Sequence, residues 1–169
     1  MKKLVGPICS FVVAIAMFIF LSIPCFDYKA SVGSTASYEK YSAWKVLKDV
    51  SSDVNGYVLF KIFTIAMIVV AVLLIIVGLL LLLKNLGALK LKFNLNMLNN
   101  ILLAAYVLMV VLALVGLFVM AGDMSGEALG VKVQYTVGIG MWLNVVFAVA
   151  GCLCAWLFAK QTKAKKKRK

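Results

Sequence analysis

Histidine is absent from this 169-residue sequence, and arginine occurs once against seventeen lysines. The long apolar runs of the chain contain no aspartate, glutamate, histidine or arginine. Proton-coupled transporters, pumps and voltage sensors use ionisable side chains at membrane depth. Membrane hydrolases need a nucleophile with a base, or a metal with its ligands. Because these groups are missing, the sequence predicts a protein that is not an enzyme and that binds no cofactor.

Cysteine is scarce, and its placement argues against a disulfide or a metal site. Cys9, Cys152 and Cys154 lie inside apolar runs, and Cys25 lies near a boundary without a cysteine partner. Cys152 and Cys154 are two residues apart, so on a helix their side chains point about 200° apart. Without histidine or a nearby acid, zinc binding is not expected. We interpret all four as small apolar residues that pack within helices.

Apolar residues make up 64% of the chain, and its mean hydropathy is +1.06. They are concentrated in four runs of 23 to 27 residues: 4–26, 57–83, 97–121 and 136–159. About 20 helical residues cross a bilayer, and backbone groups in lipid must be satisfied internally. The sequence therefore predicts an all-α membrane protein whose single domain, 1–169, is a four-transmembrane-helix bundle. The first run could instead be a signal peptide, but it is longer than the usual apolar core of one and lacks an A-x-A cleavage site.

All six acidic residues lie in two segments between these runs, 27–56 and 122–135. The start of the chain, the 84–96 segment and the 160–169 tail carry basic residues and no acid. Short loops rich in lysine and arginine stay cytoplasmic. Both termini and an inner loop, 84–96, are thus predicted inside, and the acidic segments are predicted to be outer loops. We expect a multi-pass protein of the cytoplasmic membrane, and the preference for lysine over arginine favours a bacterial host.

The first outer loop has the pattern of a small β-hairpin followed by a short helix. Apolar and polar residues alternate from Tyr28 to Val32, Gly33-Ser34 can form a turn, and 35–38 can return as a second strand. The stretch YSAWKVLKDV then places apolar residues at helical spacing. The second outer loop carries GVKVQYT, which could add a third strand. These patterns predict a small extracellular cap made of a β-hairpin and a short helix.

Three aromatic residues of this cap are candidates for an outer interaction surface: Tyr38, Tyr41 and Trp44. Aromatic side chains are favoured at protein interfaces. The alternative, which we favour, is that they form the core of the small cap or an aromatic belt at the membrane boundary.

Small residues recur at helical spacing in three of the runs, which lets helices approach closely in lipid. We predict that nine positions pack the helices together: Gly6, Ser10 and Ala14, then Thr64, Ala71 and Gly78, then Gly140, Asn144 and Ala148. Asn144 is strongly polar, so it is expected to hydrogen-bond across helices. Packing within one bundle is the favoured interpretation. A helix face offered to a partner or to a second copy is the alternative.

The tail KQTKAKKKRK has seven basic residues among its ten and no acid. Basic residues beside a membrane gain about 1 kcal/mol each near anionic headgroups. We predict cytoplasmic contacts with anionic lipid for the tail and the inner loop, by Lys163, Lys165, Lys166, Lys167, Arg168, Lys169, Lys90 and Lys92. Nucleic acid is not expected as a partner, because the tail starts at the membrane and lacks aromatic residues for base stacking. In a eukaryotic host, the last four residues would also fit a dilysine retrieval signal.

The order of these elements resembles the layout of claudin-type tetraspan proteins. Claudins carry a tryptophan and a disulfide-forming cysteine pair in the first outer loop. This loop has Trp44 and no such pair, so their sealing and pore-lining roles are not carried over. The chain is more similar to small tetraspan membrane proteins of Gram-positive bacteria, through Ile23-Pro24-Cys25, Ser42-Ala43-Trp44-Lys45-Val46-Leu47 and Gly138-Ile139-Gly140-Met141-Trp142-Leu143. The resemblance implies the layout and no particular activity.

Two functions follow as candidates. The sequence favours a non-enzymatic scaffold or accessory subunit that acts through helix faces and outer-loop contacts, on another membrane protein or on a second copy. The alternative is a small oligomeric channel or transporter component, with Thr64, Thr136 and Asn144 as its polar lining.

Overall fold

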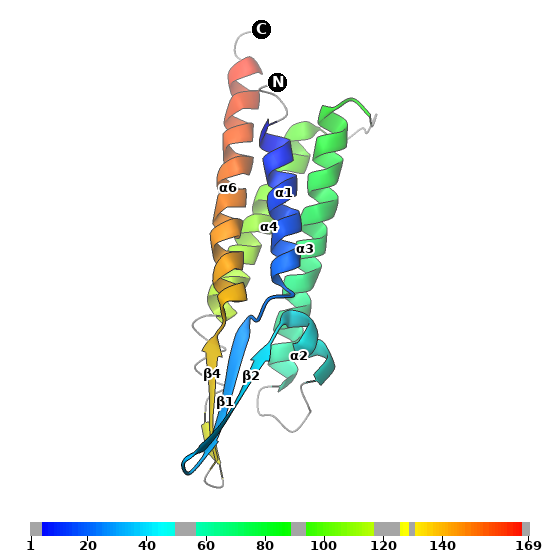
Figure 1. Ribbon diagram of the computed structural model, residues 1–169. Coiled ribbons are helices and arrows are strands. Elements are labelled where there is room, and N and C mark those ends of the chain that lie inside the picture. The colour runs from blue at the N-terminus through cyan, green and yellow to red at the C-terminus, as the bar shows by residue number, and fades with distance from the viewer. Residues whose placement is uncertain (1–4, 50–56, 89–93, 117–125, 129–130, 167–169) are drawn as a thin grey trace.

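Four long helices pack side by side, and a small antiparallel sheet extends from one end of them (Figure 1). The computed structural model describes residues 5–49, 57–88, 94–116, 126–128 and 131–166. The first and last described residues lie at the end opposite the sheet (Figure 1). The chain therefore has two parts, a helix bundle and a sheet that projects from it.

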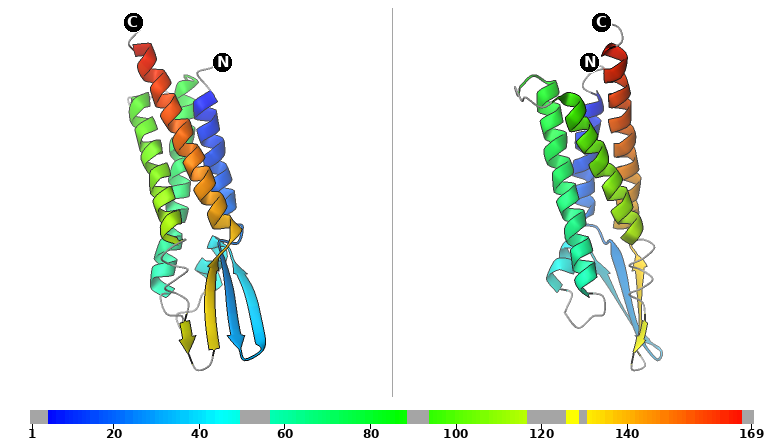
Figure 2. Two further views of the ribbon diagram at one scale, coloured as in Figure 1. Left: turned by 90° about the vertical axis from the view of Figure 1, so that its left-hand side faces the viewer. Right: turned by 180° about the vertical axis from the view of Figure 1, so that it is seen from behind.

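The bundle consists of α1 Val5–Phe20, α3 Tyr57–Asn85, α4 Leu95–Val115 and α6 Ile139–Lys166. Both α1 and α4 pack against α3 and against α6. Each helix runs antiparallel to its two neighbours, as Figures 1 and 2 show. This is the arrangement of an up-and-down bundle.

Three of these helices contain a segment long and apolar enough to cross a membrane: Lys61–Asn85, Leu95–Val115 and Ile139–Lys160. α1 is a shorter apolar helix of 16 residues. These segments support a multi-pass membrane protein.

The helix ends differ from the predicted span boundaries for local reasons. α1 ends at Phe20 instead of residue 26, because the chain tightens into turns at Leu21–Ile23 and then meets Pro24. α6 begins at Ile139 instead of residue 136, since a strand occupies the residues before it. At its other end α6 stays helical through Lys166, well into the predicted tail. The predicted end of the third run, 117–121, lies outside the described residues.

The sheet has four antiparallel strands in the order β2-β1-β4-β3: β1 Phe26–Val32, β2 Thr35–Tyr41, β3 Gly126–Ala128 and β4 Val131–Val137. Gly33 has a φ of 57° in the turn between β1 and β2, a conformation that glycine adopts without strain. The predicted fold, an all-α membrane protein with a small cap of a β-hairpin and a short helix, is thus confirmed in part, since the chain is mostly helical and the hairpin is present in a larger sheet. The hairpin gains β4 beside β1, and β3 adds a fourth strand where the sequence predicted at most three.

The sheet projects beyond the helices as a thin blade, as Figure 2 shows from the side. Its seven-residue strands extend about 23 Å at the usual rise per residue. The short helix α2, Ala43–Asp49, follows β2 and packs against α3 and β2 at the base of the blade. The edge strand β2 is exposed along nearly its whole length.

One apolar core runs through the bundle and combines large and small side chains from all four long helices. It includes these fully buried residues: Leu102, Tyr106 and Met109 of α4, Ala14 of α1, Ala71 of α3 and Ala148 of α6. In lipid, close van der Waals packing drives helix association.

Candidate functional site

Three segments that connect the sheet with the helices meet at one place. We call residues 21–26, 41–44 and 137–140 the junction. The backbone N–H of Gly138 donates to the carbonyl oxygen of Cys25 and that of Gly140 donates to Pro24, both at 2.8 Å. The Cys25 N–H donates to Tyr41 at 2.9 Å, and the Ala43 N–H donates to Leu21 at 3.0 Å. These bonds join segments that lie far apart in the sequence.

The two glycines of the junction leave no room for a side chain. A Cβ on Gly138 would lie 2.5 Å from the carbonyl oxygen of Pro24, and one on Gly140 would lie 2.8 Å from that of Ile23. The obstacles are backbone atoms that are themselves hydrogen-bonded, so they cannot move aside cheaply. The Gly138-x-Gly140 spacing is therefore required by the close approach of α6 to the end of α1.

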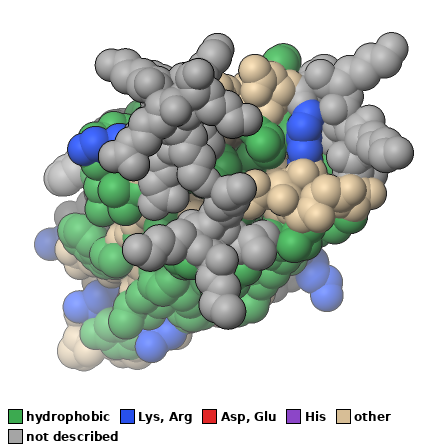
Figure 3. Space-filling view, turned by 90° about the horizontal axis from the view of Figure 1, so that it is seen from above, with side chains coloured by type: hydrophobic (Ala, Val, Ile, Leu, Met, Phe, Trp, Pro, Cys, Tyr) green, Lys and Arg blue, Asp and Glu red, His purple; other side chains and the backbone are tan. Residues whose placement is uncertain are grey.

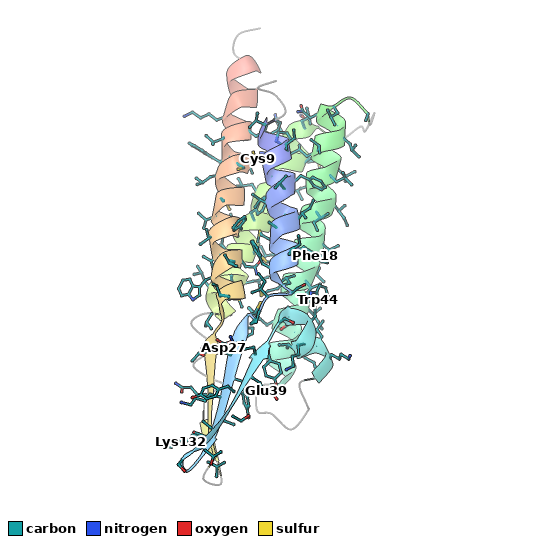
Figure 4. The ribbon with its side chains drawn as sticks, viewed as in Figure 1. Cys9, Phe18, Asp27, Glu39, Trp44 and Lys132 are labelled. Carbon is teal, nitrogen blue, oxygen red and sulfur yellow. The ribbon has the colours of Figure 1, made fainter. Side chains whose placement is uncertain are left out.

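Trp44 adds a side-chain contact to the same place. Its indole Nε1 donates to Ser22 Oγ at 3.2 Å, and its ring meets Phe18 edge-on at 5.7 Å between centroids. Figure 4 shows Phe18 and Trp44 beside each other at the base of the sheet. The ring is still 39% exposed. The three short motifs behind the sequence resemblance thus converge on the junction.

The four cysteines are free, and Cys25 is the one in the junction. Its side chain is buried, with Sγ 3.4 Å from the carbonyl oxygen of Ile23. A thiol needs access and a nearby base or cation to be reactive. Its placement instead fits a small apolar residue in a packed corner.

Of the other candidate surface aromatics, Tyr41 is engaged within the cap. Its hydroxyl donates to Glu39 Oε2 at 2.7 Å. Lys45 Nζ lies 3.4 Å from the same oxygen and 4.6 Å from the Tyr41 ring centroid. The hydrogen bond from Tyr41, and then the charge of Lys45, lower the pKa of Glu39 from its usual value.

Tyr38 instead projects from the edge strand. It is 69% exposed, and Lys29 Nζ lies 5.4 Å from its ring centroid. The structure thus separates the three aromatics: Trp44 and Tyr41 make contacts within the protein, and Tyr38 presents its ring to the surroundings.

The nine predicted packing positions lie in the bundle interior or at the junction. Ser10, Ala14, Thr64, Ala71, Gly78, Gly140, Asn144 and Ala148 are buried, and Gly6 is half-buried. A Cβ on Gly6 would lie 3.0 Å from Phe158 of α6, and one on Gly78 would lie 3.5 Å from the backbone of Phe11 in α1. These glycines therefore lie at close contacts between helices of the same chain.

Asn144 differs from its expected role. Its Nδ2 donates at 2.9 Å to the carbonyl oxygen of Gly140, one turn back in its own helix, instead of across helices. Short polar side chains readily reach their own helix backbone in this way. Its buried Oδ1 has no hydrogen-bond partner among the described residues. Thr136, predicted as pore lining with it, lies on β4 in the sheet and outside any helix.

Two polar residues of α4 were missed by the sequence analysis. The Tyr106 hydroxyl donates to the backbone carbonyl of Ser10 in α1, and its ring occupies the space where Gly151 of α6 has no side chain. Asn99 Nδ2 donates at 3.0 Å to the backbone carbonyl of Ala155 in α6. The sequence did contain an indication of both, because each is a polar side chain inside an apolar run. A polar side chain at membrane depth needs a hydrogen-bond partner.

Three of the eight predicted lipid contacts fall on described backbone, at the opposite end of the bundle from the junction. Lys163, Lys165 and Lys166 belong to the last turns of α6, and their side chains are not described. Lys90, Lys92, Lys167, Arg168 and Lys169 lie outside the described residues. Viewed from that end, Figure 3 shows lysine and apolar side chains and no acidic one among those drawn in colour.

The described residues contain no group of three or more His, Cys, Asp or Glu that could hold a metal ion. Comparisons with protein-family models, with curated proteins and with solved structures find no match. The claudin-like layout and the kinship with bacterial tetraspan proteins therefore stay predictions. What the described site offers is a fixed connection between a projecting sheet and a helix bundle.

Proposed function

We propose that this protein is a non-enzymatic membrane scaffold or accessory subunit that holds its sheet outside the membrane for contact with a partner. The partner is another membrane protein or a second copy of this chain. The junction is the observation that carries the proposal. Four backbone hydrogen bonds and two glycines without room for a side chain fix the base of the sheet on α1 and α6. A sheet fixed in this way presents Tyr38 and the exposed edge strand β2 in one orientation.

The proposed placement has four membrane spans, with both termini in the cytoplasm and the sheet outside. The protein's three tryptophans support it, because all are well exposed: Trp44 by 39%, Trp142 by 53% and Trp156 by 52%. Trp44 and Trp142 lie near the sheet and Trp156 lies toward the other end of α6. Tryptophan is enriched at both membrane boundaries. α1 rises about 24 Å over its 16 residues, so the turns after Phe20 complete its crossing.

The test is co-purification of two differently tagged copies of the full chain, and of other membrane proteins, in mild detergent. We expect retention of a second copy or of a partner, and a loss of retention on Tyr38→Ala. Ser37→Ala, its exposed neighbour on β2, is the matched control. A strictly monomeric protein that retains nothing would contradict the proposal. A reporter fused at Lys169 that reports an outside location would contradict the orientation.

The second candidate is a small oligomeric channel or transporter component. It is favoured by two buried amide oxygens, Asn99 Oδ1 and Asn144 Oδ1, which have no hydrogen-bond partner among the described residues. Buried polar atoms of this kind commonly bind water. Purified protein in liposomes tests it. Ion or solute flux that Asn99→Val or Asn144→Val changes would favour this candidate, and no flux at any protein density would exclude it.

A further inference from the structure

A continuous stripe of exposed side chains runs along one side of α6. It consists of Val146, Val149, Leu153, Trp156 and Leu157, all exposed, and it ends at the exposed Lys160. Their offsets of 3, 7, 10, 11 and 14 residues from the first keep them on one face of a helix. No described helix covers this stripe, so it is available to lipid.

The end of the stripe is chemically distinct from the rest. Lys160 Nζ lies 5.3 Å from the ring centroid of Trp156, within the range of a cation–π contact. The contact holds the ammonium group beside an indole that is itself half-exposed. Tryptophan and lysine both favour the boundary between hydrocarbon and headgroups. The apolar stripe thus ends at the ammonium group of Lys160, which the contact with Trp156 holds in place.

The sequence around Lys160 is basic and contains no acid. Seven basic residues stand in 160–169, whereas the six acids of the sequence lie in 27–56 and 122–135. The acids that the structure describes lie in the sheet and in α2, at the other end of the bundle, so none of these neutralises Lys160. The site therefore favours an anionic headgroup over a cationic or a zwitterionic one.

We propose that this stripe binds one anionic glycerophospholipid. The lipid phosphate meets Lys160 Nζ, the glycerol region meets the Trp156 ring, and an acyl chain lies along Leu153, Val149 and Val146. From Val146 to Trp156 the helix rises about 15 Å, which is half of the roughly 30 Å hydrocarbon layer and so matches one leaflet. In the proposed orientation this is the cytoplasmic leaflet, and only this assignment rests on the proposed function. Lys160 and Trp156 add to the tail residues predicted from the sequence and give the contact a defined geometry.

The experiment uses the full chain with Trp44→Phe and Trp142→Phe, so that Trp156 is the single fluorophore. The protein is reconstituted in nanodiscs of phosphatidylcholine with a minor fraction of brominated lipid, either phosphatidylglycerol or phosphatidylcholine. We expect brominated phosphatidylglycerol to quench Trp156 at a several-fold lower fraction than brominated phosphatidylcholine. Lys160→Gln should lower this preference about fivefold, the equivalent of one juxtamembrane charge, and Lys160→Arg should keep it.

Lys84→Gln is the matched control, because it removes a lysine at the same end of the bundle from α3. Equal quenching by the two lipids, or an equal loss of preference in Lys84→Gln and Lys160→Gln, would overturn the proposal. Protection from quenching by inorganic phosphate would also overturn it in favour of a free-phosphate site. Both leaflets of the nanodisc have the same composition and no protein partner is present. The result is therefore independent of the orientation and of the proposed scaffold function.

Discussion

The two ends of α6 are held in different ways. At the sheet end, Gly138 and Gly140 place the start of the helix by backbone hydrogen bonds to Cys25 and Pro24. At the other end, Lys160 Nζ lies 5.3 Å from the ring centroid of the exposed Trp156, and the helix continues through Lys166. The first end depends on shape and tolerates no added atom, whereas the second depends on charge and tolerates many side chains. Substitutions should therefore cost most at the junction and least at the periphery.

Gly138→Val should have the largest effect. Its Cβ would lie 2.5 Å from the carbonyl oxygen of Pro24, so either the helix start or the strand must shift and the hydrogen bond to Cys25 is lost. We expect a loss of about 3–5 kcal/mol of unfolding free energy, the range of severe overpacking with a broken backbone contact. Denaturation in mixed detergent micelles, followed by circular dichroism, measures it. Ile139→Ala, at the exposed neighbouring position, should stay within about 1 kcal/mol of wild type. An unchanged midpoint for Gly138→Val would show that the junction is not rigid.

Gly151→Ala should come next and tests the middle of the same helix. The added methyl group would overlap the ring of Tyr106, and overpacking of this kind costs about 1–3 kcal/mol. The obstacle here is a side chain, unlike that at Gly138, so Tyr106→Leu should relieve it. In that background Gly151→Ala should cost less than half as much, measured as a double-mutant cycle. Additive costs would mean that the two residues do not meet.

The sequence could predict the elements that local patterns determine, and it could not predict the contacts between distant segments. The apolar runs predicted helices, and the alternation before Gly33 predicted the hairpin, because both patterns are local. The junction could not be predicted in this way. Its backbone hydrogen bonds connect residues near positions 24, 41 and 138. No periodic pattern in the sequence indicates which distant carbonyl oxygen will accept a hydrogen bond from a glycine N–H. Gly138-x-Gly140 therefore looked like the start of a span.

Asn144 and Tyr106 show the same limit inside the bundle. The rule that buried polar groups need partners holds for both, but the sequence does not say which partner is within reach. Asn144 finds a carbonyl of its own helix, and Tyr106 finds one on α1 that becomes accessible only because Gly151 makes room for the ring. Partner choice depends on the packing of three helices at once.

Asn99→Ala and Asn144→Ala should separate a cross-helix bond from one within a helix. Asn99 joins α4 to α6, and hydrogen bonds between membrane helices contribute about 0.6 kcal/mol on average. Asn144 bonds within α6, so its loss should leave helix association nearly unchanged. Unfolding free energies in the same detergent should therefore show a cost of about 0.5–1 kcal/mol for Asn99→Ala and less for Asn144→Ala. A larger cost for Asn144 would mean that its Oδ1 has a partner that matters.

The smallest effect is expected at the partly exposed cluster of Glu39, Tyr41 and Lys45. The pKa of Glu39 is lowered in the folded protein, first by the Tyr41 hydrogen bond and then by Lys45. A carboxyl group whose pKa falls on folding stabilises the fold above its unfolded pKa, and this contribution disappears as the pH drops through the folded value. Exposed ion pairs contribute little, so acidification should loosen only the cap. Trp44, the residue before Lys45 on α2, reports on this cluster. Its fluorescence in a Trp142→Phe, Trp156→Phe background should change in the acid range. Glu39→Gln should remove that part of the pH dependence while Lys48→Gln, on the same short helix as Lys45, retains it. An identical acid transition in Glu39→Gln would assign the titration to another group.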